Sequence, residues 1–399
     1  MLFTPLPLAE NLEFKNGQSS PERSYNGEFF VYGSNGIIGN SNKSNSSKNT
    51  IIIGRVGSYC GSLYYSKRPC WVTDNAIICK SKNNDDRFWY YALLNLNLSR
   101  LSSGSGQSLI NQSVLQKTFC ATPSFEDREK IASVLGSLDD KIDLNRRTNE
   151  TLEAMARALF RDWFVNFGPT RAKMAGEAPY LAPELWELFP DRLDDEGKPE
   201  EWLDGTIGNW ANLNSLSWKR QNYPETVNYL DLSSVKHGII NDISQISAQE
   251  APSRAQRILR TGETVIGTVR PGNGSYAYID REGLTGSTGF ACFYAEDKKF
   301  REFVYFALTD KENIDRLTHL ADGGAYPAVR PDVVADTACT LSEQTVSAFH
   351  TVVSSWMNKI STNNIESHTL AQLRDLLLPK LMSGEISIRD AEKMVEDAA

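Results

Sequence analysis

The sequence of 399 residues lacks several features that would assign it to a familiar class. It has no run of about 18 apolar residues, so no membrane-spanning helix is predicted. Its first residues, MLFTPLPLAE, contain no basic segment followed by an apolar core, so we expect no secretory signal. The six cysteines form no CxxC pair, and the four histidines are not clustered. We therefore expect no metal site, and we interpret the cysteines as reduced thiols of a cytoplasmic protein.

Catalytic motifs are also absent. The sequence contains no GxSxG, GxxxxGK[ST] or HExxH pattern, and no NPPY- or DPPY-type tetrapeptide of a base-amino methyltransferase. The glycine-rich segments GRVGSYCG (54–61) and VRPGNGS (269–275) are not followed by a helix start, which argues against a phosphate cradle. Asp139 and Asp140 are interpreted as part of the solvated face of a long helix. We therefore expect a non-catalytic protein that binds and scaffolds.

The charge is unevenly distributed along the chain. The net charge is −8, but residues 1–120 carry 12 Lys and Arg against 7 Asp and Glu. Local charge, and not the total, governs the approach of a protein to phosphates. The overall acidity therefore does not exclude nucleic acid as a partner.

The chain repeats itself. With an offset of 218 positions, residues 104–159 align with residues 322–377 without a gap and share 11 identities. An upstream match at an offset of 213 pairs Gly54 with Gly267 and Cys79 with Cys292. The repeating unit is a β-rich module followed by a helix. Such a duplication predicts two similar lobes related by an approximate two-fold axis.

Both copies contain a long helix with a heptad seam. From Ile131 to Trp163 the core-compatible positions recur with a spacing of 4-3-4-3, and the second copy repeats this spacing. A two-fold relation would pair the helices antiparallel, and a helix of about 40 residues would form a strut roughly 60 Å long. In the alternative, each helix packs only on its own lobe. The predicted seam consists of Ile131, Leu135, Leu138, Ile142, Asn145, Asn149, Leu152, Leu159, Phe349, Val353, Trp356, Ile360, Asn363, Leu370 and Leu377.

The β-rich modules have loops that are rich in Ser, Asn, Tyr, Lys and Arg. Such side chains can form hydrogen bonds to phosphates and to base edges. Their occurrence in two copies makes DNA binding the preferred interpretation. The candidate DNA-binding residues are Tyr32, Ser34, Asn35, Lys43, Lys48, Arg55, Ser58, Tyr59, Ser105, Gln107, Lys236, His237, Arg254, Arg257, Arg270, Asn273, Ser275, Tyr276 and Tyr326.

The sequences of several segments resemble those of a known family, the specificity (S) subunits of Type I restriction-modification systems. The resemblance covers nearly the whole chain, and it is most specific over residues 123–204. The second half departs from the pattern, because GGAYPAV (323–329) stands where a Gly-Ser-Gly-Gln type stretch is usual. The matching stretches are VYGSNGIIG (31–39), GSGQSLI (104–110), PSFEDREKIASVLGSLDDKIDLNRRTNETLEAMARALFRDWFVNF (123–167), LSEQ (341–344) and LLLPKLMSGEI (376–386).

The resemblance implies an α+β fold with two β-rich target-recognition domains, joined by two long antiparallel coiled-coil helices in a pseudo-two-fold internal repeat. The implied domains are target-recognition domain 1 (1–122), a central spacer helix (123–168), a connector (169–205), target-recognition domain 2 (206–340), a C-terminal spacer helix (341–380) and a tail (381–399).

The resemblance also implies a function. Each recognition domain would read one half of a bipartite, asymmetric site in double-stranded DNA, and the paired helices would set the spacer. Two modification (methyltransferase) subunits would dock on the chain and carry S-adenosylmethionine for N6-adenine methylation. Two restriction subunits would supply ATP- and Mg-dependent translocation and cleavage. The chain itself would hold no cofactor and would serve phage defence in the cytoplasm.

Two other classes of function remain open at this point. One is a non-catalytic, two-lobed scaffold that binds proteins and has no direct role at DNA. The other is an enzyme with an unrecognised site.

Overall fold

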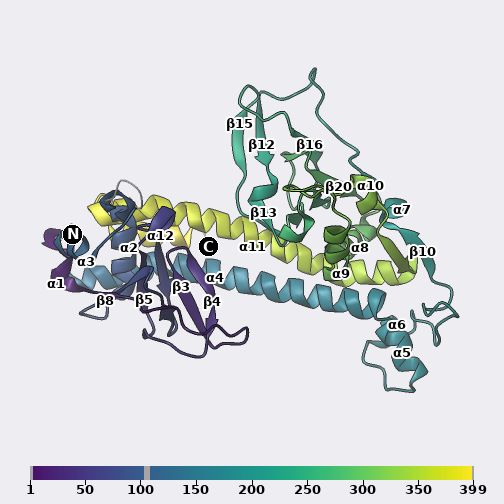
Figure 1. The fold of residues 1–399 in the computed structure, drawn as a ribbon, viewed down its shortest axis with the longest axis horizontal. Coiled ribbons are helices and arrows are strands. Elements are labelled where there is room, and N and C mark those ends of the chain that lie inside the picture. Colours follow the sequence, from purple (N-terminus) through teal and green to yellow (C-terminus); the bar gives the residue numbers. More distant parts are fainter. Residues whose placement is uncertain (1–2, 103–107, 398–399) are drawn as a thin grey trace. The chain divides into compact units, whose positions relative to one another are not determined.

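The computed structural model describes residues 3–102 and 108–397. The chain divides into two compact units, one of Met1–Arg146 with Asn364–Ala399, and the other of Arg147–Asn363. Each unit contains a β-rich lobe and a part of each of two long helices, α4 (Phe125–Phe160) and α11 (Glu343–Ser383) (Figure 1). The α+β class and the two long helices that the sequence predicts are confirmed.

The lobe of unit 1, here the first lobe, precedes α4. Its main sheet is antiparallel, with the order β2-β8-β5-β6, and a second sheet has the order β4-β3-β7. Strands β1 and β9 pair at the point where the chain enters α4. The strands are β1 (Thr4–Pro7), β2 (Leu12–Asn16), β3 (Phe29–Gly33), β4 (Gly36–Ser41), β5 (Thr50–Gly54), β6 (Leu63–Ser66), β7 (Trp71–Val72), β8 (Ala76–Ser81) and β9 (Phe119–Thr122).

The lobe of unit 2, here the second lobe, repeats this arrangement. Its sheet order β11-β20-β17-β18 matches β2-β8-β5-β6 strand for strand, and β10 pairs with β21 as β1 pairs with β9. The other sheets are β15-β12-β19-β16 and the hairpin β13-β14. The strands are β10 (Leu203–Thr206), β11 (Asn212–Leu213), β12 (Thr226–Leu230), β13 (Val235–Lys236), β14 (Ile239–Ile240), β15 (Ser244–Ser247), β16 (Ala255–Leu259), β17 (Thr264–Gly267), β18 (Tyr276–Tyr278), β19 (Leu284–Ser287), β20 (Phe290–Tyr294) and β21 (Ala338–Leu341).

One helix of each lobe packs against the main sheet, and shorter helices fill the connections. Helix α2 ends at Leu96, where Asn97 adopts a left-handed conformation with φ 49°. No helix of the described residues is long and apolar enough to cross a membrane. The helices are α1 (Leu8–Asn11), α2 (Asp86–Leu96), α3 (Gln112–Lys117), α5 (Gly168–Met174), α6 (Pro183–Trp186), α7 (Ile207–Trp210), α8 (Arg301–Thr309), α9 (Lys311–His319), α10 (Pro331–Ala335) and α12 (Ile388–Glu396).

The start of α4 is fixed by a capping residue. The Ser124 hydroxyl accepts a hydrogen bond from the Asp127 amide at 3.2 Å, which satisfies one of the free donors of the first turn. The helix continues into a π-helical turn over Arg161–Val165. All of the predicted seam positions on α4 and α11 are buried or half-buried, with Ile131 and Phe349 fully enclosed.

The core of unit 1 combines its lobe with segments of both long helices. Ile131, Leu135 and Leu138 of α4 share one apolar cluster with Leu370 and Leu377 of α11. The helix segments run antiparallel, since Asp139 meets Arg374 and Lys141 meets Glu366. Helix α12 packs against the same cluster and contributes the buried Ala391 to it. The first lobe therefore packs on a two-helix surface, and the alternative in which each helix serves only its own lobe is wrong for this unit.

The core of unit 2 is built on aromatic rings. Phe349 of α11 lies within 5.4–6.2 Å, between ring centroids, of Phe160, Trp163, Phe164 and Phe306. The connector contributes Trp186, Phe189 and Trp202 to the packing of unit 2, and all three side chains are buried.

Truncation of Phe349 tests this aromatic core. Phe349→Ala removes a fully buried ring with four aromatic neighbours, and we expect a loss of about 3–5 kcal/mol in the stability of unit 2. Differential scanning calorimetry would record this as a lower midpoint for one transition. Thr351→Ala, at an exposed position of the same helix, is the control and should shift that midpoint little. Equal midpoints for the two variants would contradict the packing described here.

Candidate nucleic-acid interface

In the first lobe, two loops that the sequence singles out are joined by backbone hydrogen bonds. The Gly57 amide donates to the Ser108 carbonyl at 3.0 Å, and the Ile110 amide donates to the Arg55 carbonyl at 3.0 Å. Ser58 and Tyr59, in the adjoining turn, are exposed. Of the other candidates here, Ser105 and Gln107 lie outside the described residues.

The remaining polar candidates of the first lobe lie on the β3–β4 turn, on the β4–β5 connection and, for Arg55, directly after β5. Asn35, Lys43 and Lys48 are exposed. Ser34 is half-buried, and its hydroxyl donates to the Asn75 carbonyl at 2.7 Å. Arg55 is also half-buried, with Nη1 3.3 Å from the Asp74 carbonyl oxygen. Ser34 and Arg55 therefore bind the backbone between β7 and β8, while the other three are open to a ligand.

Two candidates are corrected by the structure. Tyr32 is 6% exposed and packs with Ile52 and Val72, and Tyr276 is 9% exposed and belongs to the core of unit 2. Burial raises the pKa of both phenols. Both rings are enclosed by neighbouring residues of their strands and clusters, so they support the lobe from inside.

In the second lobe, the candidate side chains gather around one loop. The Arg270 amide donates to the Pro327 carbonyl at 2.7 Å, and the His237 amide donates to the Gly274 carbonyl at 2.7 Å. These two bonds bring the β13–β14 turn and the segment around Tyr326 to the 268–275 loop. The exposed members of this group are Lys236, His237, Arg270, Asn273 and Tyr326, with Ser275 half-buried beside them.

The other two arginine candidates are already engaged. Arg254 is exposed, but it forms an ion pair of 2.9 Å with Asp231 and donates to the Tyr229 hydroxyl at 3.0 Å. Arg257 is half-buried and donates to the Ser217 hydroxyl at 3.1 Å. Neither belongs to the group around Arg270.

Arg157 of α4 contacts the Tyr276 ring beside this loop, a role that the sequence did not indicate. Its guanidinium carbon lies 5.8 Å from the Tyr276 ring centroid, and its Nη2 donates to Glu153 Oε1 at 2.7 Å. The opposite neighbour of Tyr276 is the His237 ring, with 5.9 Å between centroids. A helix residue thus contacts a recognition loop through one buried ring. The 4-3 spacing leaves Arg157 off the seam, so no pattern could identify it.

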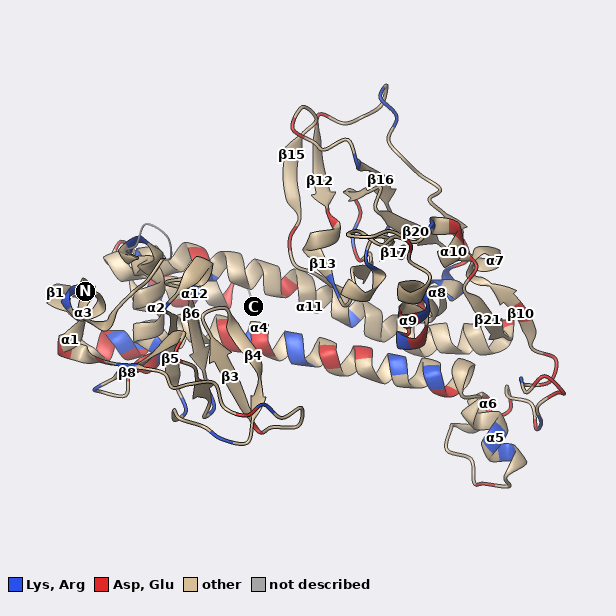
Figure 2. Ribbon diagram, in the orientation of Figure 1, with Lys and Arg blue, Asp and Glu red and all other residues tan. Residues whose placement is uncertain are grey.

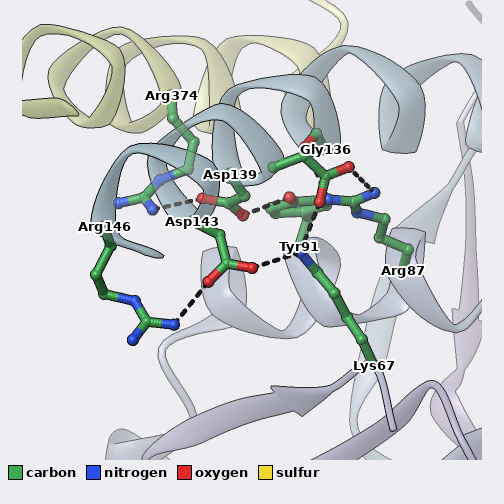
Figure 3. Close-up of polar contacts among 9 residues, drawn as sticks. Lys67, Arg87, Tyr91, Gly136, Asp139, Asp143, Arg146 and Arg374 are labelled. Atoms are coloured by element: carbon green, nitrogen blue, oxygen red, sulfur yellow. Dashed lines mark hydrogen bonds and ion pairs between the residues drawn. The ribbon is translucent and has the colours of Figure 1, made fainter. Parts of the chain in front are cut away.

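Charged groups join the first lobe to α4 (Figure 3). Lys67 Nζ donates to Asp140 at 2.6 Å and to Asp143 at 3.4 Å, and Arg87 donates to Asp140 at 2.8 Å and to the Gly136 carbonyl at 2.7 Å. The hydrogen bond from Arg87 holds the pKa of the Asp140 carboxyl below its usual value. Asp140 is exposed, as a solvated helix face requires, and its carboxylate also binds these two cations of the first lobe.

Asp139 joins three elements of the same unit. Its carboxylate accepts the hydroxyl of Tyr91 on α2, and it pairs with Arg374 of α11 at 2.8 Å (Figure 3). Burial, together with the Asp139 charge, raises the pKa of Tyr91, so this phenol stays protonated and donates. Lys, Arg, Asp and Glu alternate along α4 (Figure 2), and in this stretch the acidic members face the lobe.

A buried ion pair fixes the beginning of α4. Arg128, 8% exposed, pairs with Asp85 at 3.0 Å and donates to Asn11 at 3.1 Å. Its guanidinium carbon lies 5.3 Å from the Trp89 ring centroid. Burial makes this pair sensitive to the loss of either partner.

The buried thiols are not activated as nucleophiles. Burial raises the pKa of Cys120 and of Cys339 to about 11, so neither is poised as a thiolate. Within residues 3–102 and 108–397, no group of three or more His, Cys, Asp or Glu is arranged to hold a metal ion.

Comparison with known proteins agrees with this arrangement. Residues 8–154 match the family model for the Type I restriction modification DNA specificity domain. The Type I restriction enzyme HindI specificity subunit of Haemophilus influenzae is 27% identical over 313 residues, which cover 66% of this chain and 68% of that protein. The MjaIX specificity subunit of Methanocaldococcus jannaschii is 24% identical over 316 residues, which cover 73% and 66%.

A solved structure has a similar fold. The crystal structure of a Type I restriction-modification S subunit from M. genitalium superposes with a TM-score of 0.60 at 18% identity, covering 95% of this chain and 96% of that one. These comparisons confirm the resemblance to Type I specificity subunits. They support a role in DNA specificity and do not support a scaffold without DNA binding.

The contacts of Asp140 predict how the stability of unit 1 depends on pH. Because its folded-state pKa is lowered, Asp140 stabilises the fold above the unfolded pKa of about 4, and this contribution is lost as the pH falls through the folded value. Asp140→Asn should destabilise unit 1 at pH 7 by up to about 1 kcal/mol, since the side chain is half exposed.

Thermal melting between pH 7 and pH 3 measures this effect. The difference in midpoint between Asp140→Asn and the unmodified chain should shrink as the solution is acidified. Glu187→Gln, an exposed carboxylate in unit 2, is the control. A difference that does not depend on pH would show that the Asp140 charge has no part in these contacts.

Proposed function

We propose that this chain is the DNA specificity subunit of a Type I restriction-modification complex, and that each lobe reads one half of a bipartite, asymmetric site in double-stranded DNA. The observation that carries the proposal is the repeated lobe. The main sheets of the two lobes have the same strand order. In each lobe, a backbone hydrogen bond joins two polar loops at corresponding places: Ile110 donates to Arg55 in the first lobe, and Val329 donates to Thr268 in the second. The loop side chains differ between the lobes, as two different half-sites require.

The proposed domains follow the chain. Target-recognition domains span 1–122 and 206–340, spacer helices span 123–168 and 341–380, a connector spans 169–205, and a tail spans 381–399. The candidate DNA contacts are the exposed residues of the two loop groups, with Tyr32 and Tyr276 acting as supports.

We propose that α4 and α11 form one antiparallel coiled coil that sets the unread spacer. The contacts within each unit support this. Asn145 Nδ2 lies 3.3 Å from Ser367 Oγ in unit 1, and Asn363 Nδ2 donates to Asn149 Oδ1 at 2.7 Å in unit 2. The offset of 218 converts one pair of positions into the other, as a pseudo-two-fold relation requires. Major-groove faces one turn apart are separated by about 34–36 Å, a span that such helices could set.

The proposed partners supply the chemistry. Two modification subunits would dock on the helices and recognition domains, and would bind S-adenosylmethionine for N6-adenine methylation. Two restriction subunits would add ATP- and Mg-dependent translocation and cleavage. This chain would be non-catalytic and would choose the site.

The test is co-expression with a methyltransferase partner, followed by single-molecule sequencing of the host DNA for N6-methyladenine. We expect one bipartite motif with a fixed spacer and one methylated adenine in each half. An assembled complex that adds no sequence-specific methylation would contradict the proposal.

The repeat also predicts that half of the chain can pair with itself. A fragment of residues 1–170 carries Leu152 and Leu159 at positions equivalent to Leu370 and Leu377, which complete the core of unit 1. We expect this fragment to form a homodimer in light scattering. Leu159→Asp should reduce dimerisation by at least tenfold, because it buries an unpaired charge.

The matched control is Ala158→Asp. Ala158 and its equivalent, Leu376, are both exposed, so this change adds the same charge outside the seam. A strictly monomeric fragment, or equal effects of the two substitutions, would contradict the paired-helix proposal.

A further inference from the structure

The backbone at Arg270 is held in an uncommon conformation. Arg270 has φ 49°, in the left-handed region that residues other than glycine rarely adopt. The bridge between Val269 and Ala328, and the hydrogen bond from the Arg270 amide to Pro327, fix the loop on both sides of this residue. Such strain persists only where the surrounding structure enforces it, and it is concentrated at functional positions.

The side chain of Arg270 is also held in place. Its Nη2 donates to the Ala325 carbonyl at 2.6 Å, and its guanidinium carbon lies 4.6 Å from the Tyr326 ring centroid. Tyr326 is 71% exposed, so the ring forms an open platform at the surface. The plane of the guanidinium is thus restrained before any ligand binds.

The charge of Arg270 is not neutralised. In the described part of the chain, no carboxylate lies within 4.0 Å of it, whereas Arg254 pairs with Asp231 and Arg281 pairs with Asp280. A cation that is fixed, exposed and without a counter-charge is poised for an external acceptor.

The loop that follows Arg270 is backed by other parts of the lobe. A Cβ on Gly272 would lie 3.1 Å from the Thr318 hydroxyl of α9. Gly274 has φ +73°, and a Cβ there would lie 2.3 Å from the His237 ring. The turn is therefore packed closely against α9 and the β13–β14 turn, and its Asn273 amide donates to the Arg270 carbonyl at 2.8 Å.

We infer that the second lobe reads a guanine in the major groove with Arg270, and that Tyr326 positions the guanidinium for this contact. The inference rests on the proposed function. Guanine presents O6 and N7 as two acceptors in one plane, and an arginine fork binds them bidentately. One proton of Nη2 is used by Ala325, which leaves the other, with those of Nη1, for the base.

A fixed arginine fork can bind a phosphate as well as a base, but the two contacts have different consequences. A phosphate contact carries no sequence information, so its loss weakens binding to all duplexes alike. Stacking on Tyr326 and the hydrogen bond to Ala325 restrain the fork to one plane, which lowers the cost of ordering it on a planar base edge.

The experiment uses the complete chain in complex with its methyltransferase, and it measures both the methylation motif and binding to synthetic duplexes. With Arg270→Ala, the motif should lose its requirement for one G·C pair in one half-site, while the other half-site stays unchanged. Affinity for the cognate duplex should fall by about 5- to 150-fold, with little change for the duplex mutated at that pair. The unchanged half-site shows that the variant is folded.

Tyr326 is tested by two substitutions. Tyr326→Phe keeps the ring and should retain the motif, whereas Tyr326→Ala should relax the same G·C pair as Arg270→Ala. Arg192→Ala, which removes an exposed charge in the connector, is the control for net charge.

Two results would overturn the inference. One is an equal loss of affinity of Arg270→Ala for all duplexes with a salt dependence lower by about one charge, which would assign Arg270 to a phosphate. The other is a Tyr326→Phe variant as relaxed as Tyr326→Ala. Failure of the unmodified complex to methylate any bipartite motif would instead contradict the proposed function.

Discussion

Each core of this protein is completed by a helix segment that the chain delivers from a distant part of the sequence. In unit 1, Leu370 and Leu377 of α11 close a cluster that otherwise consists of the first lobe and α4. In unit 2, Phe160 of α4 lies among residues of α8 and α11. An apolar helix seam must be buried, and a lobe alone leaves part of it exposed. The pairing of helix segments is therefore a condition for completing the core of each unit.

Both lobes contact their helix segments through apolar packing and through charged groups. The first lobe adds Lys67, Arg87 and Tyr91, which contact carboxylates of α4, to the apolar cluster that it shares with both helices. In the second lobe, Asp310 and Glu312 pair with Arg161, while Phe303 and Phe306 of α8 pack against rings of the helices. Salt screens the exposed ion pairs in each unit, whereas the buried apolar contacts do not depend on it. The same strand order is therefore combined with different side chains at the two helix contacts.

Periodic features of this protein could be predicted from the sequence, and pairwise features could not. The heptad from Ile131 and the repeat at 218 residues predict long helices and two lobes, because both depend only on spacing. Tyr32 and Tyr276 are of a residue type that often binds DNA, but tertiary packing buries both rings. Asp139, Asp140 and Arg157 look like members of a solvated helix face until the partner from a lobe is known. The role of a single side chain can be assigned only when its tertiary contacts are known.

The same pairing explains how an acidic chain can present a surface to DNA. Several carboxylates form ion pairs within the protein. Asp139 pairs with Arg374, Asp140 with Arg87, and Asp310 with Arg161. In the described loops, by contrast, Lys43, Lys48 and Lys236 are exposed, and no carboxylate lies within ion-pair distance of them. The field near a phosphate depends on charges within about one Debye length, roughly 8–10 Å. Ion pairs between neighbouring side chains cancel within that distance, so exposed lysines and Arg270 can each present a local positive charge in spite of a net charge of −8.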